Sequence, residues 1–483
     1  MTTQQFNKVA QTALPREEFV LFGWLRTCDE QMREKIQQFA EKHHAMPCLW
    51  DYPQGRTLFL INARPDTFAD SQALLIQIGY AHTERGQRLL ASDWLQQKKV
   101  GPNSLKLEDV QGNPTLIYLS QTEPAFWVYQ SLPSISPIYY WQDADRCLFA
   151  DTLRILLPFV ESPQLNADAV PMHMIYRTMP GKSTYFKDIY RLLPGQYAQV
   201  KEGQLRATQL EQFDDYAAQV APLTNPEETI ARFNQTAEEV TASYLSMLPE
   251  GEPIHVMLLS GGVDSTLVAC FLNGNQSHVP LHSISYAMRD MPRFNAEIQY
   301  AQHAVDLLKS EHTYFDIYPQ DYVPLLEEFT DLAATPVQCE QDPCYLVFNK
   351  AQSAQPRYRY LFAGSGADTL LGSENSKRLL QAEFFKRFPG AKHWLQFSGQ
   401  LVNGFLPNKA YGLKEIACLL NSLEDPYSLH YPLHKNGAMS DLDMVTHCFS
   451  KQTLRDLLEY RFNLLAQFTH TQSLVEQLHL ASL

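Results

Sequence analysis

The stretch "IHVMLLSGGVDSTLVACFL", residues 254–272, decides the fold of the second half of the chain. It opens with an apolar run typical of a buried strand and closes with the pattern of an apolar helix. The turn between them holds Ser260, Gly261 and Gly262, which leave room for a ligand to reach backbone N–H groups. A helix that begins near Ser265 adds its positive end. The stretch therefore predicts an anion site, suited to phosphate above all.

This turn is not a Walker A loop, which needs the pattern GxxxxGK[ST] with its lysine. Asp264 occupies it instead, and a carboxylate beside phosphates makes sense with a cation between them. A second loop, "LFAGSGADTLLGS", follows another predicted strand and places Asp368 at the same face of the sheet. Asp264 and Asp368 are thus predicted to hold Mg²⁺ on a polyphosphate. The alternative for each loop is an ordinary glycine-rich turn.

Strands and helices alternate through this half of the chain. "PLHSISYA", "YFDIY" and "RYLFA" have the composition of strands, and helical spacing separates them. This alternation predicts an α/β domain with a parallel sheet and helices on both faces. A preceding helix is expected after Thr224 or Asn225, either of which can cap it. Its predicted buried face consists of Ile230, Phe233, Ala237, Val240 and Tyr244.

The first half of the chain is strand-like. "FVLFGWLR", "TLFLINAR", "PTLIYLS", "AFWVYQSL" and "PIYYW" are short aromatic or β-branched runs between turn-rich pieces. We expect a β-rich domain over residues 1–210 and the α/β domain over residues 222–483. A length of 483 residues accommodates two or three domains with their own cores.

Charge and composition exclude several classes of protein. The net charge of -14 disfavours a general binder of nucleic acid or membrane surfaces, which need basic residues. The sequence contains neither a long apolar run nor a signal peptide. Its 8 cysteines are scattered, without zinc-site spacing. The expectation is a reduced, cytoplasmic protein that binds neither nucleic acid nor membrane.

The segment "LLSGGVDS" resembles the PP-loop of N-type ATP pyrophosphatases, and the wider arrangement resembles the asparagine synthetase family. "EIQYAQHAVDLLKSEHTYFDI" and "LFAGSGADTLLGS" are similar to later parts of that family's synthetase domain. "SPIYYWQDADRCLFADTLRILL" and "TYFKDIYRLLPGQYAQV" are similar to the end of its class II glutaminase (Ntn-type) domain. The resemblance spans most of residues 110–375.

The resemblance implies ATP and Mg²⁺ as ligands and leaves the catalytic side chains unknown. Asp264 and Asp368 would bind the metal ion. His312 matches a family histidine and is interpreted as a hydrogen-bonded structural residue. Glu297 matches one member of an acidic pair whose other position is Ala296. The residues assigned to the nucleotide are Leu258, Ser260, Gly261, Gly262, Asp264, Ser265, Ser285, Ala363, Gly364 and Gly366.

The departures from the family pattern are informative. The family's glutaminase uses a cysteine directly after the initiator methionine, whereas this sequence has Thr2 there and its first cysteine is Cys28. Ser365 stands where relatives carry Tyr, Glu or His. The final lysine is Lys451, although relatives carry a late catalytic lysine; Lys435 and Lys451 are interpreted as solvated surface residues.

These features favour members without a functional glutaminase, such as β-lactam synthetases and lasso-peptide cyclases. The predicted activity is ATP-dependent formation of an amide, lactam or macrolactam. A substrate carboxylate is adenylated, and an amine of the substrate attacks. The substrate would be a small amino-acid derivative or a peptide in natural-product biosynthesis, with a possible pathway partner protein. Two alternatives stay open: a non-catalytic or partner-dependent ATP-binding homologue and, less favoured, a glutamine-dependent asparagine synthetase.

Overall fold

A computed structural model gives the fold in two compact units. One consists of Met1–Pro163, Asp188–Glu211 and Pro222–Ser365, and the other of Gln164–Lys187, Gln212–Ala221 and Gly366–Leu483. The antiparallel and parallel sheets described below belong to the first unit. The structure describes residues 19–63, 67–70, 72–83, 88–96, 110–132, 136–167, 169, 173, 179, 181–210, 225–246, 254–275, 281–290, 295–337, 344, 346, 358–364, 381, 384–403, 413 and 416.

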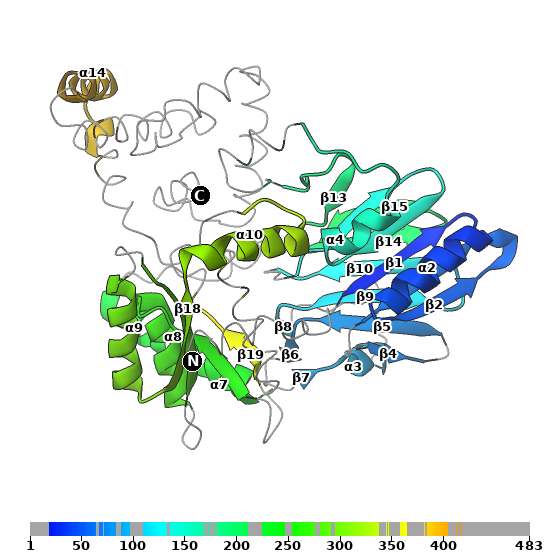
Figure 1. Cartoon of the computed structure of the whole chain (residues 1–483), viewed down its shortest axis with the longest axis horizontal. Helices are drawn as coiled ribbons and strands as arrows, with labels where there is room; N and C mark the ends of the chain where they lie inside the picture. The colour runs from blue at the N-terminus through cyan, green and yellow to red at the C-terminus, as the bar shows by residue number, and fades with distance from the viewer. Residues whose placement is uncertain are drawn as a thin grey trace. The chain divides into compact units, whose positions relative to one another are not determined.

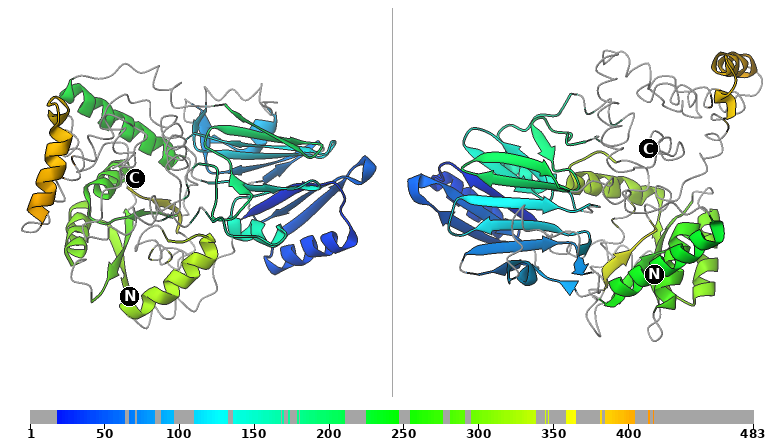
Figure 2. Two further views of the ribbon diagram at one scale, coloured as in Figure 1. Left: turned by 90° about the horizontal axis from the view of Figure 1, so that it is seen from above. Right: turned by 180° about the vertical axis from the view of Figure 1, so that it is seen from behind.

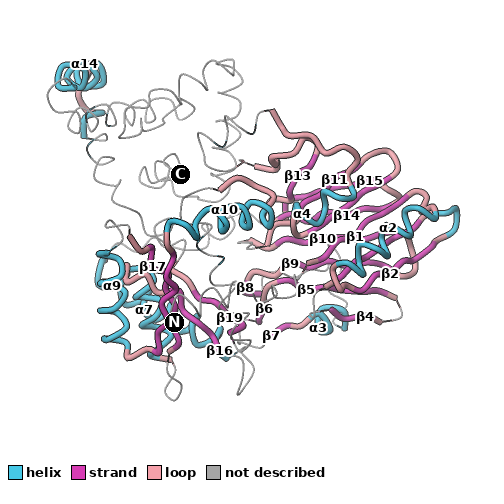
Figure 3. Tube along the Cα trace, viewed as in Figure 1, coloured by secondary structure: helices cyan, strands magenta, loops and turns pink. Residues whose placement is uncertain are grey.

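Two six-stranded antiparallel sheets make up the N-terminal part of the chain (Figures 1 and 3). The first has the order β13 (Ile189–Arg191), β11 (Tyr139–Gln142), β12 (Arg146–Ala150), β1 (Val20–Leu25), β3 (Thr57–Asn62) and β2 (Met46–Asp51). The second has the order β15 (Gln204–Gln209), β14 (Gln196–Lys201), β10 (Ala125–Gln130), β9 (Thr115–Ser120), β5 (Ala73–Ile78) and β4 (Thr67–Ala69). The five strand-like runs of the sequence form β1, β3, β9, β10 and β11, as predicted.

The two sheets pack face to face around an aromatic core (Figure 2). Phe22 on β1 makes an edge-to-face contact with Phe126 on β10, at 5.2 Å between ring centroids. Because successive side chains of a strand point to opposite faces, Phe22 and Trp24 enter this core while Leu21 points outward. Every residue of β1 is nevertheless buried, so both faces of its sheet are covered.

Helices and a small third sheet cover the outer faces. Helix α2 (Glu30–Lys42) begins at Asp29, whose side chain accepts a hydrogen bond from Met32 N, and its Phe39 contacts Phe19. Trp94 on α3 (Ala91–Gln96) packs on the second sheet. The remaining small elements are β6 (Ala81–Thr83), β7 (Arg88–Leu89), β8 (Val110–Gly112), α4 (Leu153–Leu156) and the 3₁₀ turns η1 (Pro53–Gly55) and η3 (Leu157–Phe159).

A four-stranded parallel sheet confirms the α/β prediction for the second half of the chain. Its order is β18 (Glu311–Ile317), β17 (His282–Met288), β16 (Ile254–Leu258) and β19 (Tyr358–Phe362). The chain runs outward from β16 to β18 and then returns to the other side of β16 with β19. Strand order therefore reverses beside β16, and open α/β sheets bind ligands at such a point, beyond the carboxyl ends of the strands.

Helices lie on both faces of this sheet, as predicted. On one face, α8 (Val263–Gly274) and α9 (Asn295–Leu308) contribute Ala269 and Val305 to a core with Met257 of β16. On the other face, α10 (Pro319–Ala333) contributes Leu325 to a core with Ile284 of β17. Two separate apolar layers thus fix the strands and leave their carboxyl ends to form the site.

Helix α7 (Pro226–Ser246) forms as predicted, but its expected buried face was wrong at three of five positions, since only Ala237 and Tyr244 are half-buried. Asn225 caps it, since its Oδ1 accepts a hydrogen bond from Glu227 N at 3.0 Å. Ile230 and Val240 are 61% and 45% exposed. Phe233 is 38% exposed, although its ring contacts Phe271 on α8. Helical spacing identifies an apolar stripe but cannot say how much of it a neighbour covers.

The second unit contributes one long described helix. Leu395 of α14 (Ala391–Asn403) is fully buried, together with Ile416, in a small apolar cluster. Among the helices of the described ranges, α14 included, none is both long and apolar enough to cross a membrane.

Candidate functional site

The SGGVDS loop connects β16 to α8 as the sequence predicts. Gly262 is the N-cap of α8, and Asp264 lies in its first turn. Gly261 has φ = 77°, a conformation that favours glycine. A Cβ atom at Gly261 would stand 2.2 Å from Ala301 N and 2.2 Å from the carbonyl carbon of Tyr300. The loop therefore rests directly on the backbone of α9, and only glycine fits at this position.

Two serine hydroxyls hold the loop in shape. Ser265 Oγ lies 2.9 Å from Ser260 Oγ and accepts a hydrogen bond from Ser260 N at 3.2 Å. Ser260 Oγ in turn accepts from Gly262 N at 3.2 Å. Ser265 is only 6% exposed, whereas Ser260 is exposed at the surface of the loop. The buried hydroxyl thus acts as a fixed support for the exposed one.

The end of β19 closes the site from the other side. A Cβ atom at Gly364 would stand 2.5 Å from Ser265 N and 2.8 Å from the carbonyl carbon of Asp264. Gly364 therefore packs against the first turn of α8 with no room for a side chain. This close approach brings the two glycine-bearing loops together where strand order reverses.

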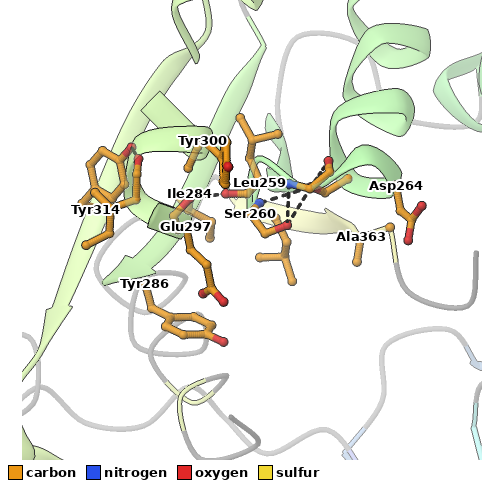
Figure 4. A pocket seen from close by; sticks show the side chains of 16 residues that line it. Leu259, Ser260, Asp264, Ile284, Tyr286, Glu297, Tyr300, Tyr314 and Ala363 are labelled. Atoms are coloured by element: carbon orange, nitrogen blue, oxygen red, sulfur yellow. Dashed lines mark hydrogen bonds between the residues drawn. The ribbon is translucent and has the colours of Figure 1, made fainter. Parts of the chain in front are cut away.

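A cavity of about 430 Å³ lies beyond the carboxyl ends of the strands (Figure 4). This volume falls in the range of small-molecule sites. Its walls include eight of the predicted nucleotide residues: Leu258, Ser260, Gly262, Asp264, Ser265, Ser285, Ala363 and Gly364. Gly261 does not line the cavity, because it packs against the backbone of α9 instead. The Ser285 hydroxyl donates to Leu259 O and so joins β17 to β16.

The charges of the cavity suit a phosphate group held by amides and a cation. The residues that line it, all within the described ranges, include the carboxylates Asp264 and Glu297 but neither lysine nor arginine. Phosphate oxygens would meet the N-terminus of α8, whose N–H groups and dipole favour anions. The Asp264 carboxylate, in the same turn, fits Mg²⁺ bound to those oxygens, because Mg²⁺ takes ligands from carboxylates and phosphates together.

Several residues weighed in the sequence lie outside the described residues. These are Gly366 and Asp368 of the predicted site, and also Thr2, Ser365, Lys435 and Lys451. Their roles stay predictions. Of the predicted metal pair, only Asp264 lies within the described ranges.

The structure also adds lining residues that sequence patterns did not assign to the site. Ile298 and Tyr300 come from the start of α9, and Tyr314 comes from β18. Tyr314 OH donates to Ile298 O at 3.4 Å, which ties that strand to the helix. In the sequence, Ile298 is only one member of an apolar stripe at helical spacing, with Ala301, Val305 and Leu308. The close approach of α9 to Gly261, which places it at the cavity, has no signal in the spacing.

His312 is hydrogen-bonded, as predicted, and lies near the start of β18, away from the carboxyl end. Its Nδ1 is 2.7 Å from Ser283 Oγ on the neighbouring strand. Its Nε2 is buried and has no hydrogen-bond partner in the described part of the structure. Burial lowers the pKa of His312 to about 4, so the ring is neutral at physiological pH.

Comparison with solved structures yields distant similarities. One structure, described as the allosteric regulatory enzyme of purine biosynthesis, is 8% identical with a TM-score of 0.26, covering 62% of this chain and 80% of that one. Another is glutamine phosphoribosylpyrophosphate amidotransferase from B. subtilis in complex with ADP and GMP. It is 9% identical with a TM-score of 0.26, covering 73% of this chain and 92% of that one. Neither similarity is close enough to support an argument.

Comparison with sequences gives a clearer result. No curated protein sequence matches the chain significantly. The model of the family described as asparagine synthase matches residues 251–468. This range contains β16, α8, β17, α9, β18 and β19, and it includes every residue that lines the cavity. The match confirms the family resemblance over these residues: the chain carries an asparagine synthase domain, and that family consists of ATP-dependent carbon–nitrogen ligases.

Proposed function

We propose that this protein forms an amide, lactam or macrolactam bond by adenylating a substrate carboxylate with Mg-ATP, which releases pyrophosphate. The observation that carries the proposal is the cavity in which Ser260, Gly262 and Asp264 meet Gly364 at the reversal of strand order. The contact of Gly261 with α9 and the contact of Gly364 with α8 hold both loops close together, so that the loop backbone borders the cavity. Such a wall suits a nucleotide polyphosphate.

Each described residue then has a physical task. The N–H groups at the start of α8 hold phosphate oxygens, and Ser265 keeps Ser260 in place beside them. Bound Mg²⁺ would neutralise phosphate charge and favour departure of pyrophosphate. Asp264, with Asp368 of the second loop, would hold that ion. The adenylated carboxylate carries a good leaving group, and an amine confined beside it benefits from a high effective concentration.

The amine is proposed to come from the substrate and not from glutamine. The first cysteine of the sequence is Cys28, in the turn between β1 and α2. Burial raises its pKa above the ordinary thiol value, so the weakly nucleophilic protonated form predominates at neutral pH. An internal Cys28 also lacks the α-amino group that serves as base in a terminal nucleophile. We therefore assign the two antiparallel sheets, which we infer to resemble a class II glutaminase domain, a supporting role.

The second candidate function is a non-catalytic or partner-dependent ATP-binding protein. The residue that favours it is Ser365, because a hydroxymethyl group replaces the larger side chains of the relatives. It directly follows Gly364 in the sequence, and Gly364 lines the cavity.

The test is release of pyrophosphate and AMP from Mg-ATP by the full-length protein. The substrates offered are aspartate, carboxyethyl-amino acids and candidate peptides, each with and without glutamine. We expect release with one substrate class and no dependence on glutamine. ATP binding without release under every condition would support the second candidate. Stimulation by glutamine, lost in Cys28→Ala or Thr2→Ala, would restore a glutaminase.

A further inference from the structure

Glu297 shares the cavity with the phosphate-binding loop, although it comes from a different helix. It lies in the first turn of α9, four residues before Ala301. Residues four apart lie on the same face of a helix, and both Glu297 and Ala301 line the cavity. The contact of Gly261 with Ala301 N, where a Cβ would stand only 2.2 Å away, fixes this helix face against the loop. Glu297 is therefore held at a defined distance from α8 by backbone packing.

The cavity has two chemically different ends. In Figure 4, Asp264 and Ala363 lie toward one side, with the N-terminus of α8, while Tyr286 and Tyr314 lie toward the other. The first side suits phosphates. The aromatic side, with Ile284 and Ile298 in its walls, suits a flat apolar group such as a nucleobase. Glu297 extends into the space between Ser260 and Tyr286.

We infer that Glu297 is a specificity-determining residue that accepts hydrogen bonds from the ribose hydroxyls of the nucleotide. This inference rests on the proposed function, in which ATP occupies the cavity. A nucleotide with its phosphates at α8 and its base at the tyrosines places its sugar at Glu297. An ionised carboxylate only accepts hydrogen bonds, and vicinal hydroxyls are the donors that a ribose offers. The predicted ligand class is a ribonucleotide in preference to a deoxyribonucleotide.

A purely local role of Glu297 makes a different prediction. An acidic residue in the first turn stabilises a helix through its dipole, as Glu227 and Glu228 do at the start of α7. That role changes stability and is indifferent to the sugar. The two roles separate when affinities for nucleotides that differ by one hydroxyl are compared within each protein, because any general loss of affinity cancels in the ratio.

The experiment is calorimetric titration of the full-length protein with Mg-ATP, Mg-2′-deoxy-ATP and Mg-3′-deoxy-ATP. The wild-type protein should bind ATP about tenfold more tightly than at least one deoxynucleotide, as a charge-assisted hydrogen bond requires. Glu297→Gln should reduce that ratio to about threefold or less, since an amide oxygen is a weaker acceptor. Glu297→Ala should bring it close to one. Glu228→Gln, in the first turn of α7, is the matched control and should keep the wild-type ratio.

Each other outcome overturns a defined claim. Wild-type binding of ATP with equal affinity for both deoxynucleotides would overturn the role of Glu297 and leave the proposed function standing. An unchanged ratio in Glu297→Ala would do the same. A wild-type protein that binds none of the three nucleotides would overturn the proposed function and this inference together. Glu297→Asp keeps the charge but shortens the side chain. If the other variants do not fold, the ratio of the affinities for ATP and the deoxynucleotides is measured in this variant instead.

Discussion

Gly364, two residues beyond the end of β19, packs on the backbone of Ser265 in the first turn of α8, where a Cβ atom would stand only 2.5 Å from Ser265 N. These residues are far apart in the sequence and belong to the two loops that form the site. Their contact needs no side chain on Gly364, and it sets the distance between the loops. The position of the N–H groups that we propose to bind phosphate thus depends on a residue that has no side chain in the cavity.

Gly364→Ala should therefore weaken ATP binding about tenfold or more. Relief of the clash would move the N–H groups at the start of α8 away from the position in which we propose that they bind phosphate. The neighbouring atoms are backbone, so the substitution should also cost about 1–3 kcal/mol of stability. Calorimetry and urea unfolding measure the two effects. Gly274→Ala, at the other end of α8 with nothing within 4 Å of the added Cβ, is the control. It should leave affinity unchanged, and equal effects of both variants would contradict the packing argument.

Asp264→Asn should abolish Mg²⁺-dependent pyrophosphate release and leave the fold intact. The amide keeps the shape of the side chain but removes the charge that a hard cation prefers. Circular dichroism checks the fold, and a coupled pyrophosphate assay over a range of Mg²⁺ concentrations checks the activity. Asp306→Asn, at an exposed position of α9, removes a carboxylate outside the cavity and should behave as wild type. Normal turnover by Asp264→Asn would show that this residue does not bind the metal ion.

Ser265→Ala should destabilise the loop by about 1–3 kcal/mol, because it leaves Ser260 N without its acceptor. ATP affinity should fall as well, since Ser260 would lose the hydroxyl that positions it. The midpoint of urea unfolding and the Kd for ATP report the two changes. Thr266→Ala, one residue further along the helix and outside the cavity lining, should change neither quantity appreciably.

His312 should make the protein sensitive to acid. Its folded-state pKa of about 4 lies below the ordinary value of 6.5, because burial disfavours the charged ring. Between these two pH values the unfolded chain binds a proton at His312, whereas the folded protein does not. Stability therefore falls as the pH drops from 6.5 toward 4. His312→Gln should lose less stability across that window than the wild type. Exposed His303→Gln should match the wild type, and urea unfolding at about pH 7 and about pH 5 distinguishes them.

The sequence predicted the local structure of the candidate site correctly where one short segment determines it. Ser260, Gly261, Gly262 and Asp264 follow a buried strand and open a helix, and local geometry alone makes that arrangement an anion site. The same local rules placed the strands of both halves and the cap at Asn225. Prediction failed for the exposed face of α7, because burial of Ile230 depends on a neighbour and not on the spacing of apolar residues.

What the sequence by itself determined is therefore the class of the fold, the strand, turn and helix around the SGGVDS segment, and the family of the domain at residues 251–468. What only the tertiary structure decided is which distant residues complete the cavity. The packing of Gly261 on Ala301 brings Glu297 to the cavity, and the packing of Gly364 on Ser265 joins the second loop to the first. The physical reason is that close backbone contact between separate elements depends on how helices and strands stack, and no periodicity within a single segment encodes that stacking.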